Sequence, residues 1–214
     1  MNQLFNPENK FWSFVGKIVD AVLMGMLWLV VSLPVFSCGA ATTAFYTFTL
    51  RQVENTEGTI WKSFFGAFRR YFKKATLLWI AELAALAFLG LDAWAAWWFY
   101  QQHGGMIALL PLILCAAVSL VVVSGCLYLY PLLARYDFPV KKLLRDAFVL
   151  ALGNLPVTLT LLLMAGLVCL GVYYVSGLCF FWHALYVFFS SYFFLSIFLR
   201  LARRESEADK DIAQ

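Results

Sequence analysis

Three polar side chains stand inside long apolar stretches of the sequence, where they could take part in chemistry. Glu82, Asp92 and Asn154 are each flanked by aliphatic and aromatic residues. A carboxylate in such surroundings is costly, and inside a membrane it often marks an ion or proton path. Glu82 is therefore a candidate for cation binding or proton relay. The competing interpretation is a carboxyl group that faces the bundle interior, either protonated or bonded to Asn154 or to a hydroxyl group.

The other two polar residues have simpler explanations. Asp92 lies ten residues beyond Glu82, beside an aromatic run, where we expect water to solvate it. Asn154 precedes Pro156 by two residues, so its amide could bond backbone carbonyls that this proline leaves free. We therefore expect a structural role for Asn154.

The remaining reactive residue types show no catalytic or metal-binding pattern. His103 and His183 have no Cys, His or carboxylate at ligand spacing. The sequence lacks a glycine-rich phosphate loop, a zinc-protease helix and a serine nucleophile elbow. Five cysteines lie singly in apolar stretches, as small packing residues do: Cys38, Cys115, Cys126, Cys169 and Cys179. We expect no enzyme activity, no metal and no cofactor.

The composition indicates an integral membrane protein. The chain has 214 residues, of which 63% are hydrophobic and 13% charged, and its mean hydropathy is +0.80. That leaves too little polar surface for a water-soluble protein, so residues 1–214 are predicted to form one transmembrane domain. The net charge of +4 does not indicate nucleic-acid binding, because the basic residues lie among Trp and Phe beside apolar runs.

One stretch, residues 59–74, predicts an amphipathic helix in the lipid headgroup layer. Its aromatic residues recur at helical spacing and it contains no acidic residue. Its basic side chains are Lys62, Arg69, Arg70, Lys73 and Lys74. A second basic group, in the next loop on the same side, comprises Lys141, Lys142 and Arg145. The positive-inside rule assigns both groups and the C-terminus to the cytoplasmic side of the plasma membrane.

The N-terminal region predicts a helical hairpin. After a polar tail at residues 1–10, the apolar stretch between Lys17 and Arg51 would be about 50 Å long as one helix, against a hydrocarbon core of about 30 Å. Pro34 and Gly39 supply a break. Two interpretations stay open: a hairpin with helices at 11–33 and 35–50, giving six spans in all, or one kinked crossing, giving five.

The rest of the chain predicts four spans, at residues 75–100, 106–133, 147–175 and 178–199. The first ends in an aromatic belt at 94–100, and residues 101–105 form a turn free of Lys and Arg, as expected on the outer side. Residues 205–214 form a polar, fraying C-terminal tail. The predicted fold is thus an all-α polytopic helix bundle with cytoplasmic amphipathic interfacial helices.

Small residues follow the proline of the hairpin. Gly39 and Thr43, and Ala40 and Ala44, are pairs four residues apart, which let a neighbouring helix approach closely. A contact within this chain is the default interpretation. A contact with another protein or with a second copy is the alternative.

Residues 27–58 and 63–79 resemble the YesL family of bacterial membrane proteins, a domain of unknown function. The residues that carry the resemblance are a Leu-Pro and Gly-Ala-Ala-Thr-Thr-Ala run at 33–44, an acidic and glycine segment at 54–58, and a phenylalanine-rich basic helix at 64–74. The resemblance implies a Gram-positive source and an association with carbohydrate uptake and polysaccharide degradation, often beside ATP-binding-cassette sugar importers. It implies no catalytic residues.

Three functions stay open from the sequence. The first is a non-catalytic accessory or regulatory partner of a carbohydrate importer. The second is a small transporter or channel that uses Glu82, Asp92 and Asn154. The third is an enzyme acting on lipid or lipid-linked sugar, which would need a polar cavity with convergent acid and base groups.

Overall fold

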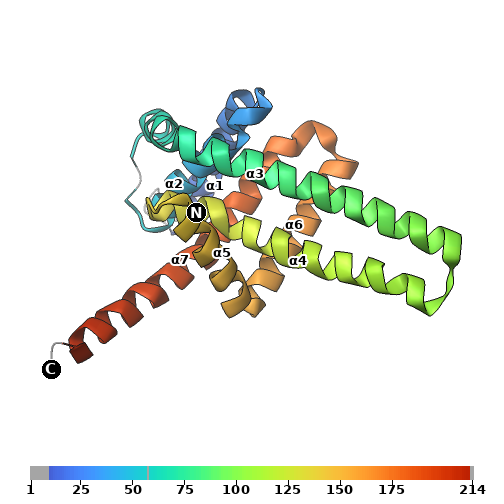
Figure 1. Cartoon of the computed structure of the whole chain (residues 1–214). Helices are drawn as coiled ribbons and strands as arrows, with labels where there is room; N and C mark the ends of the chain where they lie inside the picture. Colours follow the sequence, from blue (N-terminus) through green and yellow to red (C-terminus); the bar gives the residue numbers. More distant parts are fainter. Residues whose placement is uncertain (1–9, 57, 213–214) are drawn as a thin grey trace.

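The computed structural model describes residues 10–56 and 58–212, and every regular element in this part of the chain is a helix. The elements are α1 (Lys10–Val31), η1 (Val35–Ser37), α2 (Cys38–Val53), α3 (Ile60–His103), α4 (Gly105–Arg135), α5 (Val140–Gly153), α6 (Leu155–Tyr174), η2 (Ser176–Leu178) and α7 (Cys179–Ile212). Figure 1 shows their arrangement. The expected N-terminal tail lies outside the described residues, apart from Lys10.

Five of the described helices are long and apolar enough to cross a membrane: α1, α3, α4, α6 and α7. The prediction of an all-α polytopic membrane bundle is confirmed. The polar C-terminal segment was expected to fray, but α7 continues as a helix to Ile212 and projects from the body of the molecule (Figure 1).

The N-terminal region forms a hairpin of α1 and α2. Lys17 near the start of α1 donates hydrogen bonds to the Gln52 carbonyl and the Asn55 side chain at the end of α2, at 2.9 and 2.6 Å. Trp28, nearer the other end of α1, donates to Thr42 at 3.0 Å. This order of contacts makes the two helices antiparallel, so the prediction of one kinked crossing is wrong, although five span-length helices is the number that this alternative gave.

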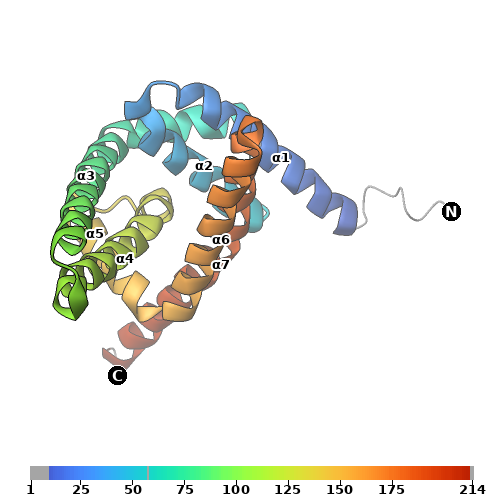
Figure 2. The same cartoon turned by 90° about the vertical axis from the view of Figure 1, so that its right-hand side faces the viewer.

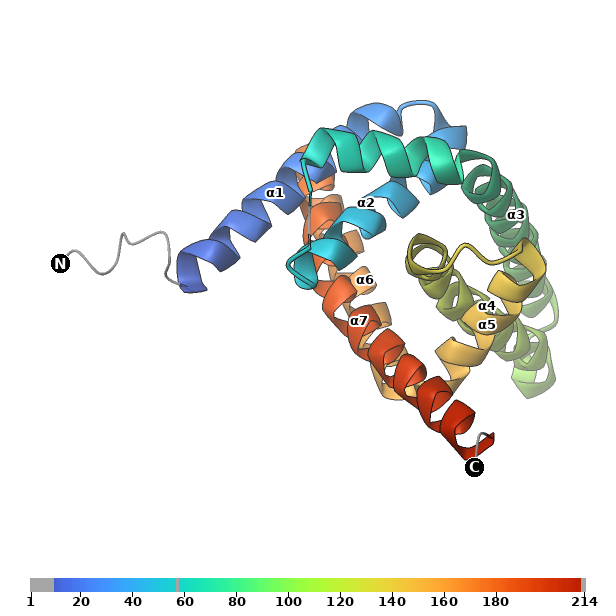
Figure 3. The same cartoon turned by 90° about the vertical axis from the view of Figure 1, so that its left-hand side faces the viewer.

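The second arm of the hairpin is an interior helix and not one of the five span-length helices. α2 has 16 residues, about 24 Å at 1.5 Å per residue. Twelve of those residues are buried, and α2 contacts α1, α3, α4 and α7. Figures 2 and 3 show α2 surrounded by the longer helices. The core of the bundle is therefore built around this short helix.

The helix expected at residues 59–74 is not a separate element. It is continuous with the following span as α3, whose 44 residues would extend about 66 Å if straight. No proline interrupts this segment, so helical hydrogen bonding continues through the two lysines. Instead of breaking, α3 bends where it passes from its basic first part to its apolar second part (Figures 1 and 3).

The single span expected at residues 147–175 is wrong. The structure divides it into α5 and α6, with Asn154 between them in a non-helical conformation. Pro156 stands at the start of α6, where its missing N–H costs no helical hydrogen bond. Asn154 and Pro156 therefore start a new helix, although apolar residues continue on both sides of them.

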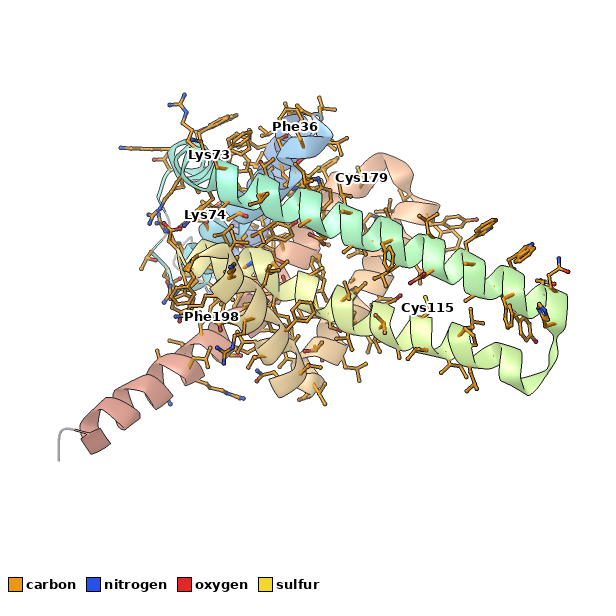
Figure 4. All side chains as sticks on the ribbon, in the orientation of Figure 1. Phe36, Lys73, Lys74, Cys115, Cys179 and Phe198 are labelled. Atoms are coloured by element: carbon orange, nitrogen blue, oxygen red, sulfur yellow. The ribbon has the colours of Figure 1, made fainter. Side chains whose placement is uncertain are left out.

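Lys73 and Lys74 mark one end of the bundle. Figure 4 shows Lys73 and Lys74 at the end opposite the α3–α4 turn, which we call the basic end. The turn itself uses the left-handed backbone of Gly104 and Gly105, with φ of 59° and 82°. The aromatic side chains just before it are exposed: Trp94 68%, Trp97 51%, Trp98 56% and Phe99 40%.

Candidate functional site

Glu82 is on α3, and its side chain contacts α4, which runs antiparallel to α3. Tyr130 on α4 donates its hydroxyl hydrogen to the Glu82 carboxyl group. The Cys126 side chain lies one turn earlier on the same face of α4. Tyr130 is only 8% exposed, whereas Glu82 is half-buried. The carboxyl group thus bonds to a hydroxyl group, and the amide of Asn154 is occupied elsewhere.

The chemistry available to this cluster is binding and exchange of a proton or a cation. Glu82 lies eight residues past Lys74, about 12 Å along the helix, and its neighbour Leu83 is exposed on the outer face. Burying a lone carboxylate costs free energy, which the Tyr130 hydroxyl group partly offsets. Among the described residues, no group of three or more His, Cys, Asp or Glu could hold a metal ion.

Asp92 lies in a lateral groove nearer the α3–α4 turn. The groove has a volume of about 420 Å³ and opens between α3 and α4. It is lined by Leu89, Asp92, Ala95, Ala96, Phe99, Pro111, Leu114, Cys115 and Val118. Asp92 is exposed and is the carboxylate among these residues, so the groove is an apolar slot with one acidic group.

Asn154 makes a local structural contact. Its side-chain amide donates to the Leu150 carbonyl at 3.1 Å, near the end of α5. Its own carbonyl accepts from the Thr158 N–H at 3.0 Å. Asn154 thereby joins the two helices. The Tyr130 contact of Glu82, the groove around Asp92 and the local contacts of Asn154 do not bring the three into one site.

The small residues of the hairpin pack α2 against α3. A Cβ atom added at Gly39 would lie 2.6 Å from the Ala75 carbonyl oxygen and 2.8 Å from the Trp79 Cβ. Ala40 and Ala44 are fully buried. The Thr43 hydroxyl donates to the Gly39 carbonyl within α2, at 2.9 Å, and so does not bond across the contact.

Pro34 lies in the turn of the hairpin and precedes η1. The Ser37 hydroxyl bonds the Val31 carbonyl at the end of α1 and the Pro34 carbonyl. Trp79 of α3 donates to the Val35 carbonyl at 2.7 Å. Proline thus ends the first arm, while a serine and a tryptophan satisfy the carbonyls of the turn.

Pairs of hydroxyl groups join helices in the interior, and the sequence did not indicate them. Tyr46 on α2 bonds Ser190 on α7 at 3.0 Å. Thr49 bonds Ser191 at 2.8 Å. Tyr128 on α4 bonds Thr158 on α6 at 2.9 Å. The sequence held one signal for these contacts, because Ser190 and Ser191 are adjacent inside an aromatic span. Buried hydroxyl groups need hydrogen-bonding partners.

The predicted basic residues lie on α3 and α5 at the basic end, and most are exposed. Two of them converge on the loop between α4 and α5: Asp137 accepts from Lys74 and lies 3.5 Å from Arg70. The Lys74 hydrogen bond lowers the pKa of Asp137. Lys142 lies over the Phe138 ring, 3.7 Å from its centroid. These contacts fix the α4–α5 loop against the first part of α3.

Comparison with known proteins agrees with the pattern at 27–79. The model of a family described as protein of unknown function, DUF624, matches residues 21–93. An uncharacterized protein YesL of Bacillus subtilis (strain 168) is 24% identical over 183 residues, covering 85% of this chain and 84% of that protein. These matches confirm the resemblance of this chain to the YesL family. No solved structure matches it.

The segment matched by the YesL-family model corresponds to one structural unit. Residues 21–93 run from the middle of α1 through α2 to the part of α3 that holds Asp92. This segment contains the turn between α1 and α2, the bend of α3 and Glu82. It does not contain Tyr130 on α4. In this protein, the carboxyl group and its hydroxyl partner therefore come from different halves of the chain.

Proposed function

We propose that this protein is a non-catalytic accessory or regulatory subunit that binds another membrane protein, an ATP-binding-cassette carbohydrate importer. The observation that carries the proposal is the exposed α3–α4 hairpin. In the most apolar 18 residues of α3 only 11% are buried, the same share as in α6, against 44% in α7. The distal part of the hairpin extends beyond the other helices (Figure 1).

The lateral groove of this hairpin supports a protein contact. Lipid satisfies an apolar helix face, so exposure by itself calls for no partner. The Asp92 carboxylate is a different case, because placing it in an apolar groove costs free energy. A polar or cationic side chain of a neighbouring helix would lower that cost. The small side chains of Ala95 and Ala96 leave room for such a helix to approach.

The interior of the bundle argues against transport as the main activity. The core is filled by large side chains such as Phe45, Phe48 and Phe194, all fully buried. The interior hydroxyl groups described above bond to one another across helices, and the acidic groups of α3 lie apart. A closed interior with an exposed hairpin fits a protein that acts by contact. The sugar importer as partner rests on the family resemblance.

In this proposal the basic end faces the cytoplasm of a bacterial cell, as the positive-inside rule requires. The C-terminal helix then extends into the cytoplasm as well. The α3–α4 turn faces outward, and the groove with Asp92 lies in the outer half of the bilayer.

Crosslinking through a native cysteine tests the proposal. Cys115 lines the groove, and Cys169 is exposed on α6. In each of two variants, Cys115 or Cys169 is the only cysteine left in the chain. The variants are treated in native membranes with a thiol-directed crosslinker, and the adducts are identified by mass spectrometry. We expect importer subunits on Cys115 and not on Cys169. Adducts with a second copy alone, or equal adducts at both positions, would contradict the proposal.

One observation favours transport as a second candidate function: Glu82 with its hydroxyl donor Tyr130 inside the membrane-spanning part. Uptake by the purified protein in vesicles, lost on Glu82→Gln, would support it. Absence of any flux from wild-type vesicles would remove it.

A further inference from the structure

A second cavity lies at the basic end, between the last turns of α2 and the first part of α3. Its volume of about 390 Å³ is within the range of small-molecule sites, about 300–1,000 Å³. It is lined by Thr47, Arg51, Gly58, Thr59, Lys62, Ser63, Gly66, Ala67, Arg70 and Tyr71. The α3 residues recur every three or four positions, so the cavity follows one face of that helix.

The cavity is strongly cationic. The lining residues include the basic side chains of Arg51, Lys62 and Arg70 and no acidic side chain. Arg70 shares Asp137 with Lys74. Among the described residues, neither Arg51 nor Lys62 has a carboxylate within ion-pair distance. In the part of the chain that the structure describes, two cations without a paired carboxylate therefore face the same space, which favours an anion.

Hydroxyl groups and a helix start add neutral donors. Thr59, Ser63 and Tyr71 line the cavity with hydroxyl groups. Thr59 is also the N-terminal cap residue of α3, and its side chain makes no capping hydrogen bond. The first backbone N–H groups of a long helix have no partner within the helix and favour negative charge. Oxygen-rich anions such as phosphate match this set of donors.

The cavity borders a part of α3 suited to the bilayer surface. Trp61 and Phe65 lie on the neighbouring face of the same helix, 63% and 42% exposed. Their rings are stacked with centroids 6.4 Å apart. Exposed Trp and Phe on a basic helix are typical of a segment at headgroup depth. We propose that this cavity binds the phosphate group of an anionic phospholipid, through Arg51, Lys62 and Arg70.

Lipid titration of the full-length detergent-purified protein, followed by native mass spectrometry, tests the proposal. The probes are phosphatidylglycerol and phosphatidylcholine with identical acyl chains, and inorganic phosphate as competitor. The cavity variant is Arg51→Gln with Lys62→Gln. The control is Arg69→Gln with Lys73→Gln, which removes the same charge from exposed positions of α3 outside the cavity.

We expect wild type and control to bind phosphatidylglycerol in preference to phosphatidylcholine. The cavity variant should bind phosphatidylglycerol about tenfold more weakly or worse. Equal weakening in both double variants would overturn the proposal, because diffuse surface charge would then be sufficient. Equal binding of the two lipids by wild type would also overturn it. Displacement of the lipid by millimolar inorganic phosphate would assign the cavity to free phosphate instead.

A second variant guards against a folding defect. A Cβ atom added at Gly66 meets nothing within 4 Å, although Gly66 lines the cavity. Gly66→Asp therefore adds a carboxylate to the cavity without displacing packed atoms. It should lose phosphatidylglycerol binding, whereas Gly66→Ala should keep it. Unchanged binding by Gly66→Asp would overturn the proposal.

Discussion

The hydroxyl group of Tyr130 on α4 donates a hydrogen bond to the Glu82 carboxyl group on α3, within the membrane-spanning part of the chain. This contact pairs the first half of the sequence with the second. It also gives a membrane carboxyl group a partner, so Glu82 has a structural role whether or not it has a further one.

Removing the donor should therefore weaken the α3–α4 pair. We expect Tyr130→Phe to destabilise the protein by about 1–2 kcal/mol, because the half-buried Glu82 carboxyl group then loses its hydroxyl donor. Glu82→Gln retains an acceptor oxygen and should change stability by less. Thermal unfolding in detergent measures both. A larger loss for Glu82→Gln than for Tyr130→Phe would show that the charge matters more than the hydrogen bond.

The close approach of α2 and α3 at Gly39 makes a second prediction. In Gly39→Ala the new methyl group meets the Ala75 carbonyl oxygen and Trp79 at under 3 Å, so the helices must separate. We expect a loss of about 1–3 kcal/mol, more than alanine gains through its helix propensity. Gly90→Ala on α3 is the matched control, since nothing lies within 4 Å of that position. It should be neutral or slightly stabilising, and similar losses in both variants would contradict the packing argument.

The sequence predicted helix class and membrane segments because a bilayer requires about 20 apolar residues per crossing. Segment boundaries were harder. Lys73 and Lys74 seemed to end an interfacial helix, but lysine is a good helix former and α3 continues through them. At Asn154 the opposite error occurred: Pro156 is a signal for a helix start and was interpreted as a proline inside one continuous span.

Partners across helices could not be predicted from the sequence. The sequence suggested a hydroxyl group or Asn154 as the partner of Glu82, and the structure assigns the hydroxyl group of Tyr130. Choosing among many hydroxyl groups requires the rotation of each helix about its axis, which strongly apolar segments leave undefined. The cationic cavity was missed for the same reason, because Arg51 is on α2 and Lys62 on α3.

The Asp137 contacts predict a pH dependence. Lys74, with Arg70 nearby, lowers the pKa of Asp137 below its ordinary value of 3.8. The stabilisation is therefore complete above that ordinary pKa and is lost as pH falls through the lower pKa of the folded state. Because Asp137 is 41% exposed, we expect less than about 1 kcal/mol. Asp137→Asn should lower the unfolding temperature at pH 7, and the difference from wild type should shrink toward pH 3. A constant difference would exclude the ion pair as its cause.

The proposed orientation predicts which positions a membrane-impermeant thiol reagent reaches from outside intact cells. In a cysteine-free background, Gln102→Cys beside the α3–α4 turn should be labelled. Lys73→Cys at the basic end should react only after the membrane is opened, because basic residues stay inside. The reverse pattern would invert the assignment of both ends.

The last prediction concerns Thr49 on α2 and Ser191 on α7, whose hydroxyl oxygens lie 2.8 Å apart in the buried interior. In a double-mutant cycle, Thr49→Val and Ser191→Ala should show a coupling of about 0.6 kcal/mol, the average for hydrogen bonds between membrane helices. The control pairs Thr49→Val with Ser196→Ala, because Ser196 is exposed and bonds the Phe193 carbonyl of its own helix. That control cycle should show no coupling. Ser191 and Ser196 each bond a backbone carbonyl of α7. Equal coupling in both cycles would therefore mean that the effect arises within α7 and not between the helices.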